Sequence, residues 1–307
     1  MYERFYELNA RPFLTVPDPS FLFWSEGHEL GYTMLRYGVE TRSLITVITG
    51  EIGAGKTTLL RHLMDDLPED VTMGLISNMQ EGRGDLLHWA MMSLDQDFGD
   101  EPYVKLFKRF QDYVIDRYAE GRRVMLVIDE AQNLSVKQLE ELRMLSNINA
   151  DRDELLQIIL VGQPQLRDLL ARPDLAQFAQ RIAADFHLPR LSAEDTARYV
   201  NHRLQVSGAR WEIFPPKTCD LIYEATGGVP RLVNILCDLA LVYGYSGERT
   251  VIEEDLLWEF LSSIRRHGIY THLASRGSLP KLVASVDEKG EETARSGRAG
   301  PLDGAGF

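Results

Sequence analysis

The stretch GEIGAGKT, Gly50 to Thr57, matches the pattern G-x-x-x-x-G-K-[ST] at every fixed position. An apolar run rich in β-branched residues, LITVIT, comes directly before it, and a helical pattern, TTLLRHLM, begins at its last residue. A strand, a glycine-rich turn and a helix in this order bring several backbone N–H groups and the positive end of a helix to one phosphate. The motif and its setting therefore predict a phosphate-binding loop of the Walker A type.

The residues of this loop have separate predicted roles. Gly50, Gly53 and Gly55 let the backbone curl so that its N–H groups converge. Lys56 reaches the β- and γ-phosphates, and the Thr57 hydroxyl ligates magnesium. The predicted ligands are therefore ATP and Mg²⁺; the alternative, a glycine-rich turn with a solvated lysine, is disfavoured by the flanking strand and helix. The predicted nucleotide contacts are Gly50, Glu51, Ile52, Gly53, Ala54, Gly55, Lys56, Thr57 and Thr58.

A second motif, VMLVIDEAQ from Val124 to Gln132, is an apolar run that ends in two acids and has the form of a Walker B motif. In open α/β sheets the carboxyl ends of the strands face the ligand crevice. Asp129 is therefore predicted to hold magnesium, and Glu130 to orient or deprotonate an attacking water. This pair favours hydrolysis over a small-molecule kinase, which must exclude water. The alternative is that the two acids only open the next helix, where negative charge is favourable.

Apolar runs alternate with helical patterns from about residue 44 to residue 187. The five runs are SLITVITG, VTMGLIS, RVMLVID, LLQIILVG and ADFHL. Between two of them, Leu139, Leu142, Leu145 and Ile148 recur at helical spacing. Strands that alternate with helices indicate βαβ units and a parallel sheet. We therefore expect an α/β fold over residues 1–190, a P-loop core with a parallel sheet between two helical layers.

The pattern changes after Pro189. Ser192 precedes AEDTARYVNHRL, which has acids in its first turn, and PPKTCDLIYEATGG opens with prolines and closes with glycines, as helices do. Two more helical patterns follow, VPRLVNILCDLALVYGYSG and IEEDLLWEFLSSIRRHG. Residues 191–268 are therefore expected to form a small all-helical domain. Residues 275–307 are poor in large apolar side chains, so we expect a disordered polar tail there.

Composition limits the class of protein. Of the 307 residues, 44% are hydrophobic and 26% charged, as in ordinary globular proteins. The formal net charge of −13 disfavours DNA binding, which needs clustered Lys and Arg. No apolar stretch approaches the roughly 18 residues of a membrane helix, and the N-terminus has no signal-peptide pattern. The two cysteines, Cys219 and Cys237, lack metal spacing. We therefore expect a cytoplasmic protein without a direct membrane span.

Several segments in order over residues 1–265 give a family resemblance. They include MYERFYELNARPF, ITGEIGAGKTTLLRHL, MLVIDEAQNLS, LLQIILVGQPQL, FAQRIAADFHLPRL and GGVPRLVNILCDLAL. The chain resembles the AAA+ ATPases of the general secretion pathway protein A (ExeA-like) type, which are similar to the transposition ATPases of the TniB and MuB kind. The resemblance implies that the helical domain is a lid and that the N-terminal segment, residues 1–43, lines the adenine pocket of the core.

The resemblance also implies three further site residues. Gln163 in LVGQP occupies the place of the polar residue that senses the γ-phosphate, although a glutamine there can also cap a strand end. Arg181 in AQRIAADFHL occupies the place of the arginine that reaches into the neighbouring subunit's site; the alternatives are a surface residue and the nearby Arg190. Arg231 in GGVPR occupies the place of the lid arginine on the nucleotide phosphates. Fixed guanidinium groups suit the charge of a transferring phosphoryl group.

The function that the resemblance implies is an ATP-hydrolysing AAA+ protein, a homo-oligomer when active, that remodels or regulates an unidentified protein partner in secretion or envelope export. The alternative is a DNA-associated ATPase that recruits a transposase or another DNA-processing enzyme. Secretion-type members continue into a membrane span and a peptidoglycan-binding region, and this sequence shows no such span. We therefore expect any membrane anchor to come from a partner.

Overall fold

The structure of the protein is a computed structural model, which describes residues 1–16, 18–77, 85–99, 101–148 and 154–267. The predicted polar tail, residues 275–307, lies outside the described residues. The chain divides into two compact units. Among the described residues, the core unit contains residues 15–191 and 229–231, and the helical unit contains residues 1–14, 192–228 and 232–267.

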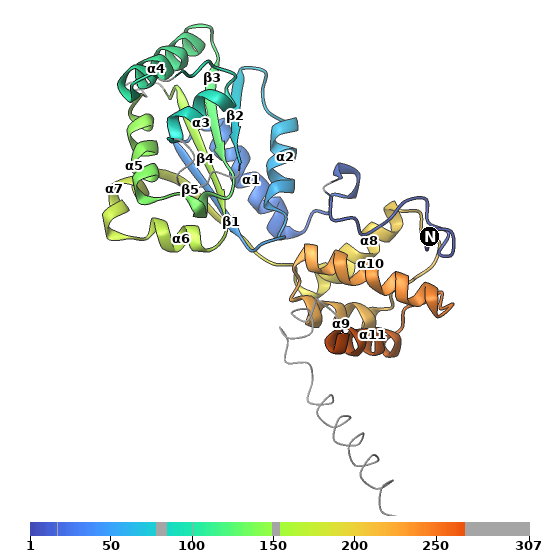
Figure 1. The fold of residues 1–307 in the computed structure, drawn as a ribbon. Helices are drawn as coiled ribbons and strands as arrows, with labels where there is room; N and C mark the ends of the chain where they lie inside the picture. Colours follow the sequence, from blue (N-terminus) through green and yellow to red (C-terminus); the bar gives the residue numbers. More distant parts are fainter. Residues whose placement is uncertain (17, 78–84, 100, 149–153, 268–307) are drawn as a thin grey trace, which may run out of the picture. The chain divides into compact units, whose positions relative to one another are not determined.

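The core unit is built around a sheet of five parallel strands in the order β2-β3-β4-β1-β5 (Figure 1). Each strand overlaps one of the five predicted apolar runs, so the predicted parallel α/β fold is confirmed. The strands are β1 (Ile45–Gly50), β2 (Val71–Ile76), β3 (Arg123–Ile128), β4 (Leu156–Gly162) and β5 (Ile182–Leu188).

Helices cover both faces of this sheet, which gives the core unit three layers (Figure 1). One face carries α1 (Glu26–Glu40) and α2 (Lys56–Asp65). The other face carries α3 (Leu86–Ser93), α4 (Tyr103–Ala119), α5 (Val136–Leu145), α6 (Gln165–Leu170) and α7 (Ala176–Ala179).

The interior strand β3 shows why the sequence forms such layers. Val124, Leu126 and Ile128 pack in the core on one face, whereas Met125 and Val127 pack in the core on the other. Successive side chains of a strand point to opposite faces, so a strand covered on both sides is apolar along most of its length. The uninterrupted apolar run before the two acids therefore predicts an interior strand that ends at the sheet's carboxyl edge.

The helical unit contains α8 (Ala193–Val206), α9 (Pro216–Thr226), α11 (Glu254–His267) and all but the first two residues of α10 (Pro230–Ser246). The predicted helix ends are confirmed. The Ser192 hydroxyl accepts a hydrogen bond from the N–H of Asp195 at 3.0 Å, which caps α8. Pro216 occupies the first turn of α9, and Gly227 ends that helix with a φ of 60°.

The first 14 residues belong to the helical unit, whereas the sequence analysis assigned residues 1–43 to the core. The buried Tyr6 hydroxyl donates to the carbonyl of Arg249 at 3.0 Å. The guanidinium of Arg203, only 6% exposed, donates to the carbonyls of Pro12 and Leu14. Buried backbone carbonyls need such donors, and buried aromatic side chains need an apolar partner. These long-range contacts are invisible in the sequence pattern, so the boundary lies at residues 14 and 15 rather than before residue 1.

Candidate functional site

The loop between β1 and α2 has the backbone shape that a phosphate-binding turn requires. Gly53 and Gly55 have φ values of +79° and +104°, in the left-handed region that side chains other than glycine rarely adopt. Gly55 is the N-cap of α2, and no side chain in the described part of the chain caps this helix end. Since the first N–H groups of a helix lack partners within the helix, they can bind an anion. The loop therefore fits a nucleotide phosphate.

Lys56 is held inside this loop. Its side chain is only 7% exposed, unlike the solvated lysine of a plain glycine-rich turn. Its Nζ donates to the carbonyl oxygens of Gly50 and Glu51, at 2.8 and 3.0 Å. Burial lowers the pKa of Lys56, and the negative charges of Glu130, Asp129 and Glu51 act in the opposite direction. The ammonium group is therefore close enough to both acids of the Walker B motif to interact with them electrostatically.

Asp129 and Glu130 follow the last residue of β3. One carboxylate oxygen of Asp129, Oδ1, accepts the backbone N–H of Glu130 at 2.9 Å. Burial raises the pKa of Asp129, and the neighbouring charge of Glu130 adds to this effect. Glu130 has a φ of 55° and a ψ of 37°, a left-handed conformation that costs about 1–2 kcal/mol for a residue with a side chain. The turn after β3 therefore fixes the direction in which the Glu130 side chain leaves the backbone.

The Glu130 carboxylate is bound by two amide side chains. Its Oε2 accepts Nε2 of Gln132 at 2.5 Å and Nε2 of Gln163 at 3.1 Å. The Oε1 atom of Gln132 in turn accepts the backbone N–H of Gln163 at 2.8 Å. Burial acts to raise the pKa of Glu130, but these hydrogen bonds and the charge of Lys56 hold it below its ordinary value. The structure thus brings Glu130 and Gln163, from neighbouring strands, into direct contact.

The oxygen donors of Thr57 and Asp129 suit a magnesium ion that is bound together with a nucleotide. Among the described residues, no three His, Cys, Asp or Glu side chains lie close enough together to hold a metal ion. Magnesium is usually held by one or two carboxylates together with substrate phosphates and water, rather than by an all-protein cage. The Thr57 hydroxyl at the start of α2 and the Asp129 carboxylate are oxygen donors of the kind that such a site uses.

Arg231 and Arg190 lie beside the loop within the core unit. The backbone N–H of Arg231 donates to the carbonyl of Gly53 at 3.2 Å. A Cβ atom at Gly53 would lie 2.4 Å from Cβ of Arg231, so only glycine allows this approach. The Nη2 atom of Arg190 lies 2.9 Å from Oε1 of Glu51. The backbone of Arg231 and the guanidinium of Arg190 therefore lie beside the phosphate-binding loop.

Arg181 lies at the opposite end of the sheet. It precedes β5 and follows α7, so it is not itself in a helix. Its neighbour Ile182 pairs with Ile45, whereas the last residue of β5 pairs with Gly50. The Arg181 guanidinium donates to the carbonyl of Arg143, to the Ser146 hydroxyl and, at 2.6 Å, to Oδ1 of Asn147. The structure does not bring Arg181 to the phosphate-binding loop of its own subunit.

The sequence analysis missed two residues of this site, Gln132 and His28. Gln132 belongs to the sequence DEAQ at the end of the second motif. Its position only two residues after Glu130 could have indicated a contact with that carboxylate. His28, from α1, contacts the loop through the carbonyl of Ala54 at 3.0 Å. No local pattern marks it, because the contact joins residues 26 positions apart.

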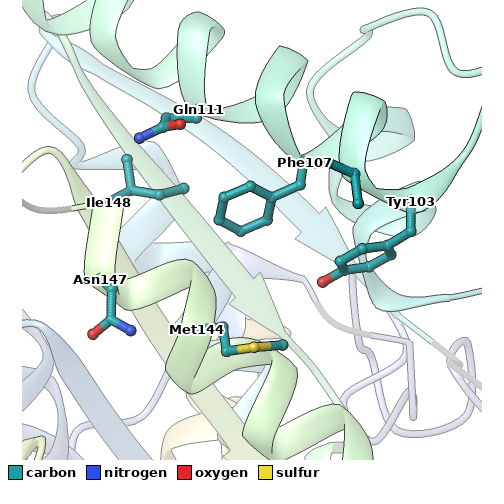
Figure 2. Close-up of a pocket in the computed structure, with 7 residues that line it drawn as sticks. Tyr103, Phe107, Gln111, Met144, Asn147 and Ile148 are labelled. Carbon is teal, nitrogen blue, oxygen red and sulfur yellow. The ribbon is translucent and has the colours of Figure 1, made fainter.

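Two cavities open on the helix face that carries α4 to α7. One, of about 480 Å³, lies between α4 and the end of α5 (Figure 2). It is mostly apolar, and none of its lining residues belongs to the predicted site; they are Tyr103, Val104, Phe107, Gln111, Met144, Asn147 and Ile148. The other, of about 790 Å³, lies between α6 and β5 and includes one predicted contact, Glu51. The site is therefore defined by the phosphate-binding loop rather than by a closed pocket.

The parallel sheet, the phosphate-binding loop and the helical unit form a P-loop fold of the AAA+ type. A family described as "AAA domain" matches residues 39–170. Over 258 residues the chain is 37% identical to general secretion pathway protein A of Aeromonas hydrophila, a match that covers 83% of this chain and 47% of the relative. The chain thus spans about half the length of the curated relative. Residues 39–170 therefore carry an AAA domain, and the chain is similar to general secretion pathway protein A.

Solved structures support the same fold. The Aeropyrum pernix ORC2 protein, in complexes with ADPNP and ADP, has a TM-score of 0.61 at 18% identity, over 83% of this chain and 71% of that one. Drosophila ORC bound to DNA has a TM-score of 0.62 at 14% identity, over 96% of this chain and 84% of that one. At such identities the likeness shows the fold alone. Within the described residues, no helix is both long and apolar enough to cross a bilayer.

Proposed function

We propose that this protein binds ATP with magnesium in the loop between β1 and α2 and hydrolyses it with Glu130 as the base. The observation that supports this most directly is the convergence of Lys56, Asp129, Glu130 and Gln163 at the carboxyl ends of β1, β3 and β4. One basic, two acidic and one amide side chain, drawn from three strand ends, form the set that phosphoryl transfer to water needs.

The binding roles follow from the chemistry of each group. Residues 50–58 contact the phosphates through backbone N–H groups, the Lys56 ammonium and the Thr58 side chain or backbone. Thr57 and Asp129 hold magnesium, which when bound neutralises phosphate charge. The bonds from Lys56 to the carbonyls of Gly50 and Glu51 exchange for bonds to phosphate oxygens. Since hydrogen bonds to charged acceptors are the stronger ones, the exchange favours the bound state.

Hydrolysis requires a base and fixed positive charge. Glu130 accepts a proton from the attacking water through the oxygen that the two amide donors leave uncovered, Oε1. Gln163 senses the γ-phosphate, a role that the hydrogen bond from its amide to Glu130 supports. Arg231 contacts the phosphates in the same subunit. Arg181 supplies its charge to a neighbouring subunit, so the active form is a homo-oligomer.

The biological role that we propose is remodelling or regulation of a protein partner in secretion or envelope export. The related region of general secretion pathway protein A, at 37% identity, supports this role. The net charge of −13 disfavours the alternative, an ATPase that assembles on DNA and recruits a DNA-processing enzyme.

The test is the Glu130→Gln variant. The amide cannot take a proton, so steady-state phosphate release should fall about 100-fold or more while Mg-ATP binding persists. Binding is measured by equilibrium titration with a fluorescent ATP analogue, and turnover by phosphate release. With ATP, the variant should co-purify with its protein partner. Wild-type turnover in this variant would place the base elsewhere, and co-purification of DNA without a protein partner would favour the alternative role.

A further inference from the structure

His28 touches the phosphate-binding loop from the side opposite to the predicted phosphate. It lies in the first turn of α1 and is only 6% exposed. Its ring nitrogen Nε2 lies 3.0 Å from the carbonyl oxygen of Ala54, a loop residue that is fully buried. A carbonyl oxygen can only accept a hydrogen bond, so Nε2 carries the hydrogen and donates it.

The other ring nitrogen of His28 is also held. Nδ1 lies 2.7 Å from the hydroxyl of Ser25, which is buried and is the N-cap residue of α1. In the neutral ring, Nδ1 accepts the serine hydroxyl while Nε2 donates to the loop. The same hydroxyl accepts the backbone N–H of His28 at 3.3 Å. The imidazole is therefore fixed at both nitrogens, and its orientation is set by the helix cap.

The first turn of α1 is packed tightly between the loop and Pro189, so it has little room to move away from the loop. A Cβ atom at Gly55 would lie 2.6 Å from Nε2 of His28, so the ring lies directly against the loop backbone. In the same turn of α1, a Cβ atom at Gly27 would lie 2.6 Å from Cγ of Pro189. Because Gly27 and Gly55 leave no spare room, the donor of His28 has little freedom to move relative to Ala54.

The peptide unit that His28 binds also contains a phosphate-binding N–H. The carbonyl of Ala54 and the N–H of Gly55 belong to one trans peptide and point in opposite directions. A hydrogen bond that fixes the Ala54 carbonyl toward α1 therefore directs the Gly55 N–H away from α1, into the curve of the loop. Gly55 also opens α2, whose first N–H groups have no side-chain cap.

We infer that His28 is a positioning residue of the nucleotide site, which aims the Gly55 N–H at the nucleotide's phosphates by holding the Ala54–Gly55 peptide. The inference rests on the proposed ATP site. It assigns the start of α1 to the binding machinery, although His28 itself touches no phosphate.

Binding of fluorescent ADP and AMP to the full chain tests this inference. His28→Leu keeps apolar bulk and removes the donor, so ADP affinity should fall about tenfold, the worth of one charge-assisted hydrogen bond. AMP affinity should change less, because the loop is built for the β-phosphate. His28→Gln keeps an amide donor near the position of Nε2 and should stay within about threefold of wild type. His28→Asn is too short to place a donor there and should resemble His28→Leu.

The control for a general loss of α1 stability is Leu35→Ala, which opens a cavity in the core about two turns further along the same helix. It should lower the melting temperature and leave ADP affinity unchanged. Wild-type ADP affinity in folded His28→Leu would overturn the inference, as would an equal loss in Leu35→Ala. If His28→Leu does not fold, equal affinities for His28→Gln and His28→Asn would overturn it.

Lys56→Ala distinguishes a failure of the His28 inference from a failure of the proposed ATP site. If Lys56→Ala loses ADP while His28→Leu retains it, the ATP site stands and only the role of His28 is wrong. If the wild-type chain and Lys56→Ala bind ADP equally, the proposed function fails together with the inference.

Discussion

The carboxyl end and the amino end of the sheet hold different parts of the predicted machinery. At the carboxyl end, Lys56, Glu130 and Gln163 interact within one subunit. At the amino end, Arg181 is bound to the last turn of α5 and to the 3₁₀ turn after it. The two ends of β5 are separated by six residue steps, about 20 Å of strand. That separation is too long for a side chain to bridge, so Arg181 does not reach the phosphate-binding loop of its own chain, and the role that we propose for it needs a second copy.

In the function that we propose, a single chain contains the nucleotide-binding site, and a second copy completes the catalytic site. The nearby cations, Lys56, Arg190 and Arg231, lie beside the loop where ATP is expected to bind. The charge that develops on the transferred phosphoryl group needs a further cation for fast turnover. We expect the largest effect from a substitution at the carboxyl end of the sheet, a smaller one at the amino end, and the smallest from the residues that surround the carboxyl-end site.

Lys56→Ala should abolish detectable ATP binding and reduce phosphate release to background, the largest effect that we expect. The side chain is the only buried ammonium group in the described part of the chain, and it stands at the phosphate position. Equilibrium titration with a fluorescent ATP analogue measures the loss, and circular dichroism checks the fold. Lys56→Met, which keeps the buried methylene packing, should behave in the same way. Normal affinity in a folded variant would remove the loop from the site.

Arg181→Ala should bind ATP normally and lose roughly 10³-fold in turnover, because a neighbouring subunit lacks the charge that it needs. Mixing Arg181→Ala with Lys56→Ala should restore some activity, since one kind of interface joins an intact loop to an intact arginine. The measurements are phosphate release in that mixture and across a dilution series of the wild type, whose specific activity should rise with concentration.

The matched control for Arg181 is Arg172→Ala, which removes an exposed arginine that pairs with Asp174 on the same segment. It should leave turnover unchanged. Activity strictly proportional to wild-type concentration, with no rescue in the mixture, would limit Arg181 to its structural bonds with α5.

Gln132→Met should move the acid limb of the pH–rate profile to higher pH and lower turnover several-fold. The hydrogen bond from Gln132 favours the charged form of Glu130 and so holds the pKa of that carboxyl down. Its removal raises this pKa, so the carboxylate is protonated, and the base lost, at a higher pH. Gln138→Met, which disturbs only the cap of α5, is the control and should leave the profile in place. An unmoved acid limb in Gln132→Met would show that Gln132 does not govern the base.

Arg190→Ala should raise the KM for ATP a few-fold, the smallest effect that we expect, because half-exposed ion pairs contribute about 1 kcal/mol or less. Without Arg190, the carboxylate of Glu51 is left beside the phosphates. Glu51→Gln in the same background should restore the KM, and the effect should shrink at high salt because screening weakens it. Steady-state kinetics at two ionic strengths provide the check; a KM that rises equally in the double variant would mean that Arg190 contacts the nucleotide itself.

The sequence alone determined the sheet, the phosphate-binding loop and the order of the helices. The reason is that each depends on neighbours in the chain. A strand buried on both faces is apolar along most of its length, as at residues 124–128 of β3, and a loop that curls around an anion needs glycines at fixed spacing, as at Gly53 and Gly55. Caps such as Ser192 and Gly227 likewise act within one helix turn.

Only the tertiary structure decided which distant residues meet. The attachment of residues 1–14 to the helical unit depends on Arg203, some 190 positions later in the chain, and the support of the loop depends on His28 from α1. The two amide groups that bind Glu130 come from Gln132 in the same turn and from Gln163 after the next strand of the sheet. The position of Arg181 at the amino end of the sheet follows from the register of β5 on β1. Single hydrogen bonds across the fold leave no periodic trace in a sequence, because any polar residue of suitable length can make them once packing has brought the partners together.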